Sequence, residues 1–140
     1  MRKRMTMAWV AALVAAAAVP AAAQDAELED GRWLPYLGCW VEEGVLDGPM
    51  TCIVPDGPGA AFLTVVDAEV TERRSVAGDD VPRPVDVAGC TGTETARFSS
   101  DGHRVFTTAE VTCSGAERRT EGLMAMVEPD RWIDVRALAD

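Results

Sequence analysis

Residues 103–138 read HRVFTTAEVTCSGAERRTEGLMAMVEPDRWIDVRAL, and this stretch decides the fold. Side chains alternate between the two faces of a β-strand, and residues 105–113 show that alternation of apolar and polar types. Turn-forming residues at Gly115 and Pro129 interrupt the pattern, and a new run of strand-forming residues follows each of them. Short loops join strands that pair antiparallel. The stretch therefore predicts a three-stranded antiparallel meander.

The rest of the chain repeats this pattern of short strand-forming runs separated by glycine and proline. Residues 77–87 contain Gly78, Pro82 and Pro84 and predict an irregular loop. With the meander, the pattern predicts an all-β fold, an antiparallel meander of seven or eight strands arranged as a β-barrel or a β-sandwich. The additional strands are expected at residues 37–43, 50–54, 61–66, 69–76 and, weakly, 94–98.

The N-terminal residues have the features of a cleaved secretory signal peptide. Arg2, Lys3 and Arg4 precede an apolar run at residues 8–19, and small residues lead up to Ala23. The run is shorter than the roughly 20 residues that span a bilayer, so no stable membrane insertion is expected after cleavage, and the protein is expected to be secreted or periplasmic. The expected organisation is a signal peptide at 1–23, an acidic lead-in at 24–34 and a single β domain at 35–140.

The charge of the chain excludes one class of partner. The sequence carries 13 basic and 23 acidic residues. Without Arg2, Lys3 and Arg4, 10 basic residues face 23 acidic ones, a formal net charge of −13. Binding to phosphates needs a concentrated basic patch, so nucleic acid is not an expected partner.

Four cysteines follow the predicted signal peptide: Cys39, Cys52, Cys90 and Cys113. An even number in a small exported domain predicts two disulfides, for which three connectivities exist. Because neighbouring strands of a meander bring cysteines close in sequence together, we expect the pairs Cys39–Cys52 and Cys90–Cys113. A thiolate zinc site is the alternative, but no Cys-x-x-Cys spacing is present and His103 is the only histidine. Neither a metal nor a cofactor is expected.

Residues for catalysis are sparse. His103 is the only side chain that could serve as the base of a nucleophilic hydrolase, and it directly follows an Asp-Gly turn, where an exposed histidine is the simpler interpretation. Glu110, Glu121 and Glu128 lie on expected strands, where pairing with arginines of neighbouring strands is an alternative to carboxylate catalysis. The sequence predicts a protein that is not an enzyme.

The tripeptide Gly38-Cys39-Trp40 at the start of the first strand resembles the Gly-x-Trp signature of lipocalins and related calycin barrels. In that family the tryptophan closes one end of the barrel and an arginine near the last strand packs on it. Trp40 and Arg136 are the matching positions here. The resemblance implies a lipocalin-like barrel whose interior binds a small apolar ligand.

We therefore predict a binding module rather than a catalyst. Its partner would be a small apolar ligand, with Tyr36, Trp40, Trp132 and Arg136 as candidate ligand-binding residues and Trp33 as a further core or lining aromatic. The alternative is a protein-interaction or structural module of the cell envelope without a ligand cavity. A carboxylate-based hydrolase is the least favoured of the three classes.

Overall fold

The computed structural model describes residues 28–45, 47–87 and 89–139. The expected signal peptide lies outside the described residues. The described part contains one 3₁₀ helix and nine strands, one or two strands more than the sequence predicts. The elements are η1 (Gly31–Tyr36), β1 (Gly38–Val41), β2 (Met50–Asp56), β3 (Gly59–Val66), β4 (Glu69–Val76), β5 (Arg83–Val87), β6 (Cys90–Phe98), β7 (Arg104–Cys113), β8 (Ala116–Glu128) and β9 (Arg131–Ala139).

The strands form two antiparallel sheets, one of β1 to β4 and one of β5 to β9, and each strand pairs with the next one in sequence. The expected all-β antiparallel meander is thus confirmed within each sheet. Among the described strands, hydrogen-bonded pairing joins neither β4 to β5 nor β9 to β1. The expectation of a lipocalin-like closed barrel is therefore wrong for this architecture, because two strand junctions lack the ladder that closure requires.

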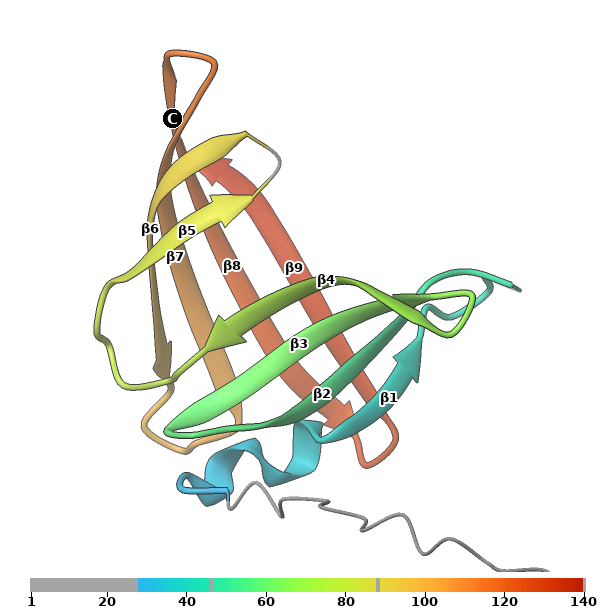
Figure 1. Ribbon diagram of the computed structural model, residues 1–140. Coiled ribbons are helices and arrows are strands. Elements are labelled where there is room, and N and C mark those ends of the chain that lie inside the picture. Colours follow the sequence, from blue (N-terminus) through green and yellow to red (C-terminus); the bar gives the residue numbers. More distant parts are fainter. Residues whose placement is uncertain (1–27, 46, 88, 140) are drawn as a thin grey trace, which may run out of the picture.

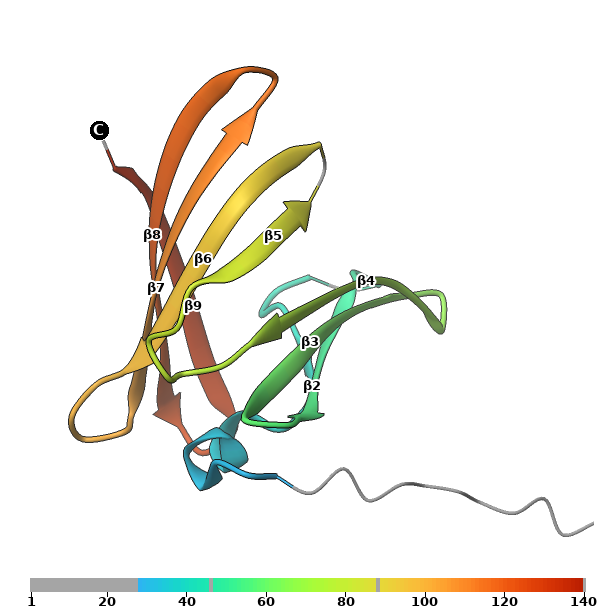
Figure 2. The same cartoon turned by 60° about the vertical axis from the view of Figure 1, so that its left-hand side comes forward.

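The two sheets meet at one end and diverge at the other (Figures 1 and 2). We call the end that holds η1 and the turns at Gly57 and Pro129 the closed end. We call the end with the turns at Asp67 and Ser114 the open end. Because one face of each sheet is turned toward the other, the inward side chains make the core where the sheets are close.

The hydrophobic core lies at the closed end and combines η1 with both sheets. Trp33 is fully buried and makes edge-to-face contacts with Phe62 of β3 and Phe98 of β6, at ring-centroid distances of 6.0 and 5.0 Å. Burying such side chains contributes about 1.5–3 kcal/mol each. The core consists of Trp33, Tyr36, Ile53, Ala60, Phe62, Val76, Ala96, Phe98, Val105 and Met124.

Helix η1 presents its aromatic residues to the core because of its period. A 3₁₀ helix has three residues per turn, so Trp33 and Tyr36 share one face and are buried, while Leu34 is exposed. Asp30 caps the helix by accepting a hydrogen bond from the backbone N–H of Arg32 at 3.0 Å. The boundary expected between lead-in and domain thus falls inside an ordered, core-forming helix.

Two disulfides join neighbouring strands at positions directly opposite each other. Cys39 of β1 is bonded to Cys52 of β2, and Cys90 of β6 is bonded to Cys113 of β7. These are the pairs expected from the adjacency of strands in a meander. The first holds the four-residue edge strand β1 to its neighbour, and the second fastens β6 to β7 at the open end.

The loop expected at residues 77–87 is partly a strand. Strand β5 occupies Arg83–Val87, and β6 begins at Cys90 rather than at residue 94. Pro84 is compatible with this strand because β5 lies at the edge of its sheet, where a missing N–H does not interrupt a ladder. The composition of this segment therefore led to a loop prediction at residues where the prolines do not prevent a strand.

The segment between β4 and β5 crosses from one sheet to the other and is held at several points. Asp79 receives two hydrogen bonds from the guanidinium of Arg83, at 2.7 and 2.8 Å, and Asp80 donates its backbone N–H to the carbonyl of Ala96 at 2.8 Å. Gly78 packs against Phe98 so closely that a Cβ atom would lie 2.2 Å from the ring. The crossing is therefore an ordered connection that covers the core.

Candidate functional site

A cleft separates the two sheets toward the open end. It has a volume of about 470 Å³. A second hollow of about 390 Å³ lies between β4 and β5 and shares Arg74, Val85 and Glu94 with it. We call the larger space the inter-sheet cleft; it is lined by Thr51, Phe62, Thr64, Glu72, Arg74, Val85, Cys90, Glu94, Thr107, Ala109, Val111, Thr120, Trp132, Asp134 and Arg136.

The inward face of each long strand changes from apolar to polar between the closed end and the cleft. Along β6, the buried residues Phe98 and Ala96 are followed by Glu94, which lines the cleft. Along β9, Trp132 packs against the core and Arg136 lines the cleft. The cleft thus has an aromatic floor, and its walls combine charged and hydroxyl-bearing residues with Val85, Ala109 and Val111.

One ion pair joins the two sheets across the cleft. Arg74 of β4 lies 3.2 Å from the carboxylate of Glu94 of β6, and the two side chains are only 18% and 12% exposed. The guanidinium of Arg74 also lies over the ring of Phe62, 5.5 Å from its centroid. Burial lowers the pKa of Arg74, and the charge of Glu94 opposes this shift, so the guanidinium stays protonated at neutral pH.

A second ion pair lies on the wall formed by β9. Arg136 and Asp134 are two residues apart on one face of the strand, and their charged atoms are 2.9 Å apart. Glu72 adds a further carboxylate to the lining. With two guanidinium groups, three carboxylates and four threonine hydroxyls, the cleft can both donate and accept hydrogen bonds.

The structure separates the four residues that the sequence singled out for ligand binding. Trp132 and Arg136 line the inter-sheet cleft. Tyr36 is buried at the closed end, where its hydroxyl donates a hydrogen bond to the carbonyl of His103 at 3.0 Å and burial raises its pKa. Trp40 is also at the closed end. Tyr36 and Trp40 therefore support the base of the cleft from within the protein.

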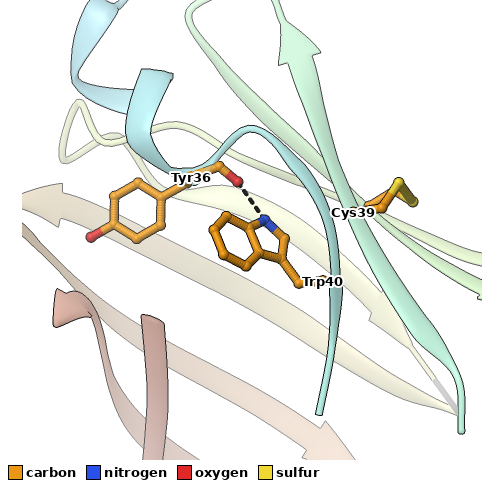
Figure 3. Close-up of a disulfide and its surroundings, with 4 residues drawn as sticks. Tyr36, Cys39 and Trp40 are labelled. Carbon is orange, nitrogen blue, oxygen red and sulfur yellow. Dashed lines mark hydrogen bonds between the residues drawn. A yellow bond between two sulfur atoms is a disulfide. The ribbon is translucent and has the colours of Figure 1, made fainter. Parts of the chain in front are cut away.

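Trp40 is held by two contacts. Its indole N–H donates to the carbonyl of Tyr36 at 2.8 Å, and its side chain and that of Cys39 lie on opposite sides of β1 (Figure 3). Its ring meets that of Trp132 edge to face, with centroids 6.3 Å apart. The lipocalin resemblance implied packing against Arg136, whereas the structure gives Trp40 an aromatic partner and Arg136 a carboxylate partner.

Sequence reasoning missed the pair of Arg74 and Glu94 in the cleft. The segment that contains Arg74 has few apolar residues, a composition typical of an exposed edge strand. The available signal in the sequence was that the apolar Val76 shares one face of the strand with Glu72 and Arg74. Val76 is buried in the structure. An apolar residue at the end of a charged face indicates that this face turns toward the core at that end.

The carboxylates considered for catalysis lie away from the cleft. Glu110 and Glu121 both lie near Arg119, at 3.5 and 3.1 Å, and their side chains are well exposed. Since Ala109 and Val111 line the cleft, Glu110 projects from the other face of β7. Glu128 pairs with Arg131 at 3.0 Å. These carboxylates therefore belong to surface ion pairs, as the alternative interpretation of the sequence held.

The described residues contain no group of three or more histidine, cysteine, aspartate or glutamate side chains placed to hold a metal ion. In the same part of the chain, no helix has the length and apolar character needed to cross a membrane. No protein-family model, curated protein or solved structure matches the chain.

Proposed function

We propose that the protein is an exported, disulfide-stabilised binding module whose inter-sheet cleft takes a small molecule. The observation that carries this proposal is the cleft of about 470 Å³ between the inward faces of the two sheets. Ligand sites in proteins have volumes of about 300–1,000 Å³ and combine apolar lining with a few polar groups. Disulfides persist in oxidising compartments, which supports a secreted or periplasmic location.

The lining narrows the ligand class. Phe62 and Trp132 provide an aromatic floor, whereas Arg74, Glu94 and Arg136 provide charges in the walls. A purely apolar molecule would remove those charges from water without replacing their hydrogen bonds, which is costly. The proposed ligand is therefore amphipathic, with an apolar part against the floor and a polar or charged part between the walls.

The architecture that we propose for this function is a β-sandwich that opens toward one end. The likeness to lipocalins contributes only the idea of binding in the interior of an antiparallel β fold. In a closed barrel the ligand enters through one mouth. Here the absence of ladders from β4 to β5 and from β9 to β1 in the described strands leaves the cleft accessible from its sides as well.

The proposal is tested by filling the cleft without disturbing the core. Ala109→Trp places a large side chain in the cleft, and Thr108→Trp places the same side chain on the other face of β7 as a matched control. Native mass spectrometry of the exported protein is expected to detect a bound small molecule. An environment-sensitive amphipathic dye is expected to bind at the same place and to be displaced by that molecule.

We expect A109W to weaken dye binding at least tenfold and T108W to leave it unchanged, with both variants keeping the circular dichroism of the parent protein. Equal binding by the two variants would contradict the cleft as the site. Absence of any bound molecule together with absence of dye binding by the parent protein would also contradict it.

A second candidate function is an envelope interaction or structural module without a bound ligand. The observation that favours it is that the two cleft arginines, Arg74 and Arg136, already have carboxylate partners in the protein. A ligand would have to compete with Glu94 and Asp134 or bind beside them. Chemical crosslinking in the envelope that retrieves a protein partner, combined with a cleft that takes no dye, would favour this second candidate.

A further inference from the structure

The two sheets have four edge strands, and three of them are poor templates for pairing with another chain. β1 has only four residues, and β5 has five and includes Pro84. β4 is longer, but Glu69, Glu72, Arg73 and Arg74 crowd it with charge. Short length, proline and charge are the devices by which proteins protect sheet edges. Strand β9 (Arg131–Ala139) is the exception. It has nine residues and no proline, and its pairing with β8 is regular after the first pair.

The sequence of β9 is complementary to itself when the strand is turned around. If two copies pair antiparallel about Val135, Asp134 of each copy lies opposite Arg136 of the other. Opposite charges directly across an antiparallel pair stabilise it. Within one chain Asp134 and Arg136 already lie 2.9 Å apart, so pairing would build a network of four alternating charges. Moving the two-fold axis by one residue, to Asp134 or to Arg136, would place two like charges opposite each other.

The apolar residues of β9 match in the same register. Val135 would face its own copy, and Ile133 would face Ala137. Val135 is 55% exposed and Ile133 is 40% exposed in the single chain, so pairing would remove apolar surface from water. On the same outward face, Leu123 of β8 is the register partner of Val135 and continues the apolar surface away from the edge.

Charge also favours this edge over the rest of an acidic surface. Residues 24–140 carry a formal net charge of −13, which opposes the approach of two copies. In β9, Arg131 is paired with Glu128 and Arg136 with Asp134, so the charges at this edge are balanced. Figure 1 shows β9 along the border of its sheet, with its upper half clear of the four-stranded sheet.

We infer that β9 binds a second copy of this chain, joining the two five-stranded sheets into one continuous antiparallel sheet with Val135 at the two-fold axis. The partner is thus an identical chain, recognised by backbone hydrogen bonds, by the charge pairs of Asp134 with Arg136 and by the apolar row on the outward face. This inference depends on β9 and not on occupancy of the cleft.

The test is the mass of the oxidised protein in solution, measured by sedimentation equilibrium from low micromolar to submillimolar concentration. The parent protein is expected to reach twice the chain mass. Val135→Glu places two carboxylates at the axis and is expected to give the chain mass throughout. Val70→Glu is the matched control, because Val70 is 58% exposed on edge strand β4, and it is expected to behave as the parent protein.

Charge reversal tests the register. D134R and R136D each place like charges opposite one another and are expected to weaken the dimer at least tenfold, whereas the double variant D134R/R136D restores opposite pairs and is expected to recover it. V135C is expected to form a disulfide-linked dimer on mild oxidation. A parent protein that stays at the chain mass, or a dimer that V135E leaves intact, would overturn the inference.

Discussion

The closed end and the open end of this protein are built from the same strands but are stabilised by different interactions. At the closed end, Trp33 from η1 packs between Phe62 and Phe98 of opposite sheets. At the open end, threonines and charged residues share the inward positions with the small apolar residues Val85, Ala109 and Val111. Arg74 and Glu94 make the half-buried ion pair between the sheets there. Burial of apolar surface thus holds one end, and polar pairing with covalent bonds holds the other.

This difference explains why a small acidic chain can keep an open cleft. Close packing at the closed end fixes the angle of the two sheets without filling the space between them along their whole length. The disulfide Cys90–Cys113 lies where the core does not reach and keeps β6 beside β7. The cleft can therefore be polar without loss of the fold, because the apolar core lies at the closed end.

The largest effect is expected at the closed end. Trp33→Ala removes a fully buried aromatic residue that contacts both sheets, and it should lower the free energy of unfolding by about 3–5 kcal/mol. Leu34→Ala in the same helix is the control, since Leu34 is exposed and its loss should change stability by less than about 0.5 kcal/mol. Urea unfolding measures both, and similar midpoints for the two variants would contradict the assignment of Trp33 to the core.

The next effect concerns the open end. Replacing Cys90 and Cys113 together by serine should lower the free energy of unfolding by about 3 kcal/mol and should expose the tip of the β7–β8 hairpin to proteases first. Replacing Cys39 and Cys52 instead should release β1 and leave that tip resistant. Cleavage sites identified by mass spectrometry would show whether each disulfide protects its own end.

A smaller effect is expected from the ion pair between the sheets. Arg74→Met leaves the carboxylate of Glu94 without its partner in a half-buried site and should cost about 1.5–3 kcal/mol. The double variant R74M/E94M should regain a large part of that loss, because no unpaired charge remains. In the exposed pair of Arg131 with Glu128, Arg131→Met should cost under about 1 kcal/mol. If R74M and R131M lowered the free energy of unfolding equally, the ion pair in the cleft would be as exposed to solvent as the pair on the outer surface.

The smallest effect is a pH dependence at the crossing segment. Hydrogen bonds from Arg83 lower the pKa of Asp79 to about 2. Because the pKa of Asp79 is lower in the folded protein than in the unfolded chain, its ionised form stabilises the fold. This contribution is fully present above about pH 4 and is lost as the pH falls toward 2. Arg83→Gln should raise the pKa of Asp79 toward its usual value and flatten this part of the stability profile. A carbon-13 NMR titration of the carboxyl group checks the shift, and an unchanged pKa in R83Q would refute its cause.

The sequence predicted the strands of the meander and both disulfides because these depend on local properties. Alternation with period two locates residues 105–113, and adjacency of strands brings Cys90 opposite Cys113. It also placed Trp33 among the candidates for the core. These features need no knowledge of how the two sheets are oriented.

The cleft could not be predicted in the same way. Periodicity assigns Val105, Thr107 and Ala109 to one face but cannot say that the face is buried at one end and open at the other. The separation of Tyr36 from Arg136 depends on the angle between the sheets, which no local pattern encodes. Strand β5 is not predicted because Pro84 is a typical loop residue, although an edge strand accommodates it.

The most direct test of the difference between the two ends is residue-resolved hydrogen exchange of the oxidised protein under native conditions. Protection reflects how much of the structure must open before an amide meets water. We predict the slowest exchange at Ile53, Val105 and Met124 near the closed end. We predict faster exchange in the parts of β7 and β8 that lie between the level of Ala109 and the open end. Uniform protection along these strands, or the slowest amides beside Cys113, would contradict an account in which the apolar core at the closed end is the most stable part of the fold.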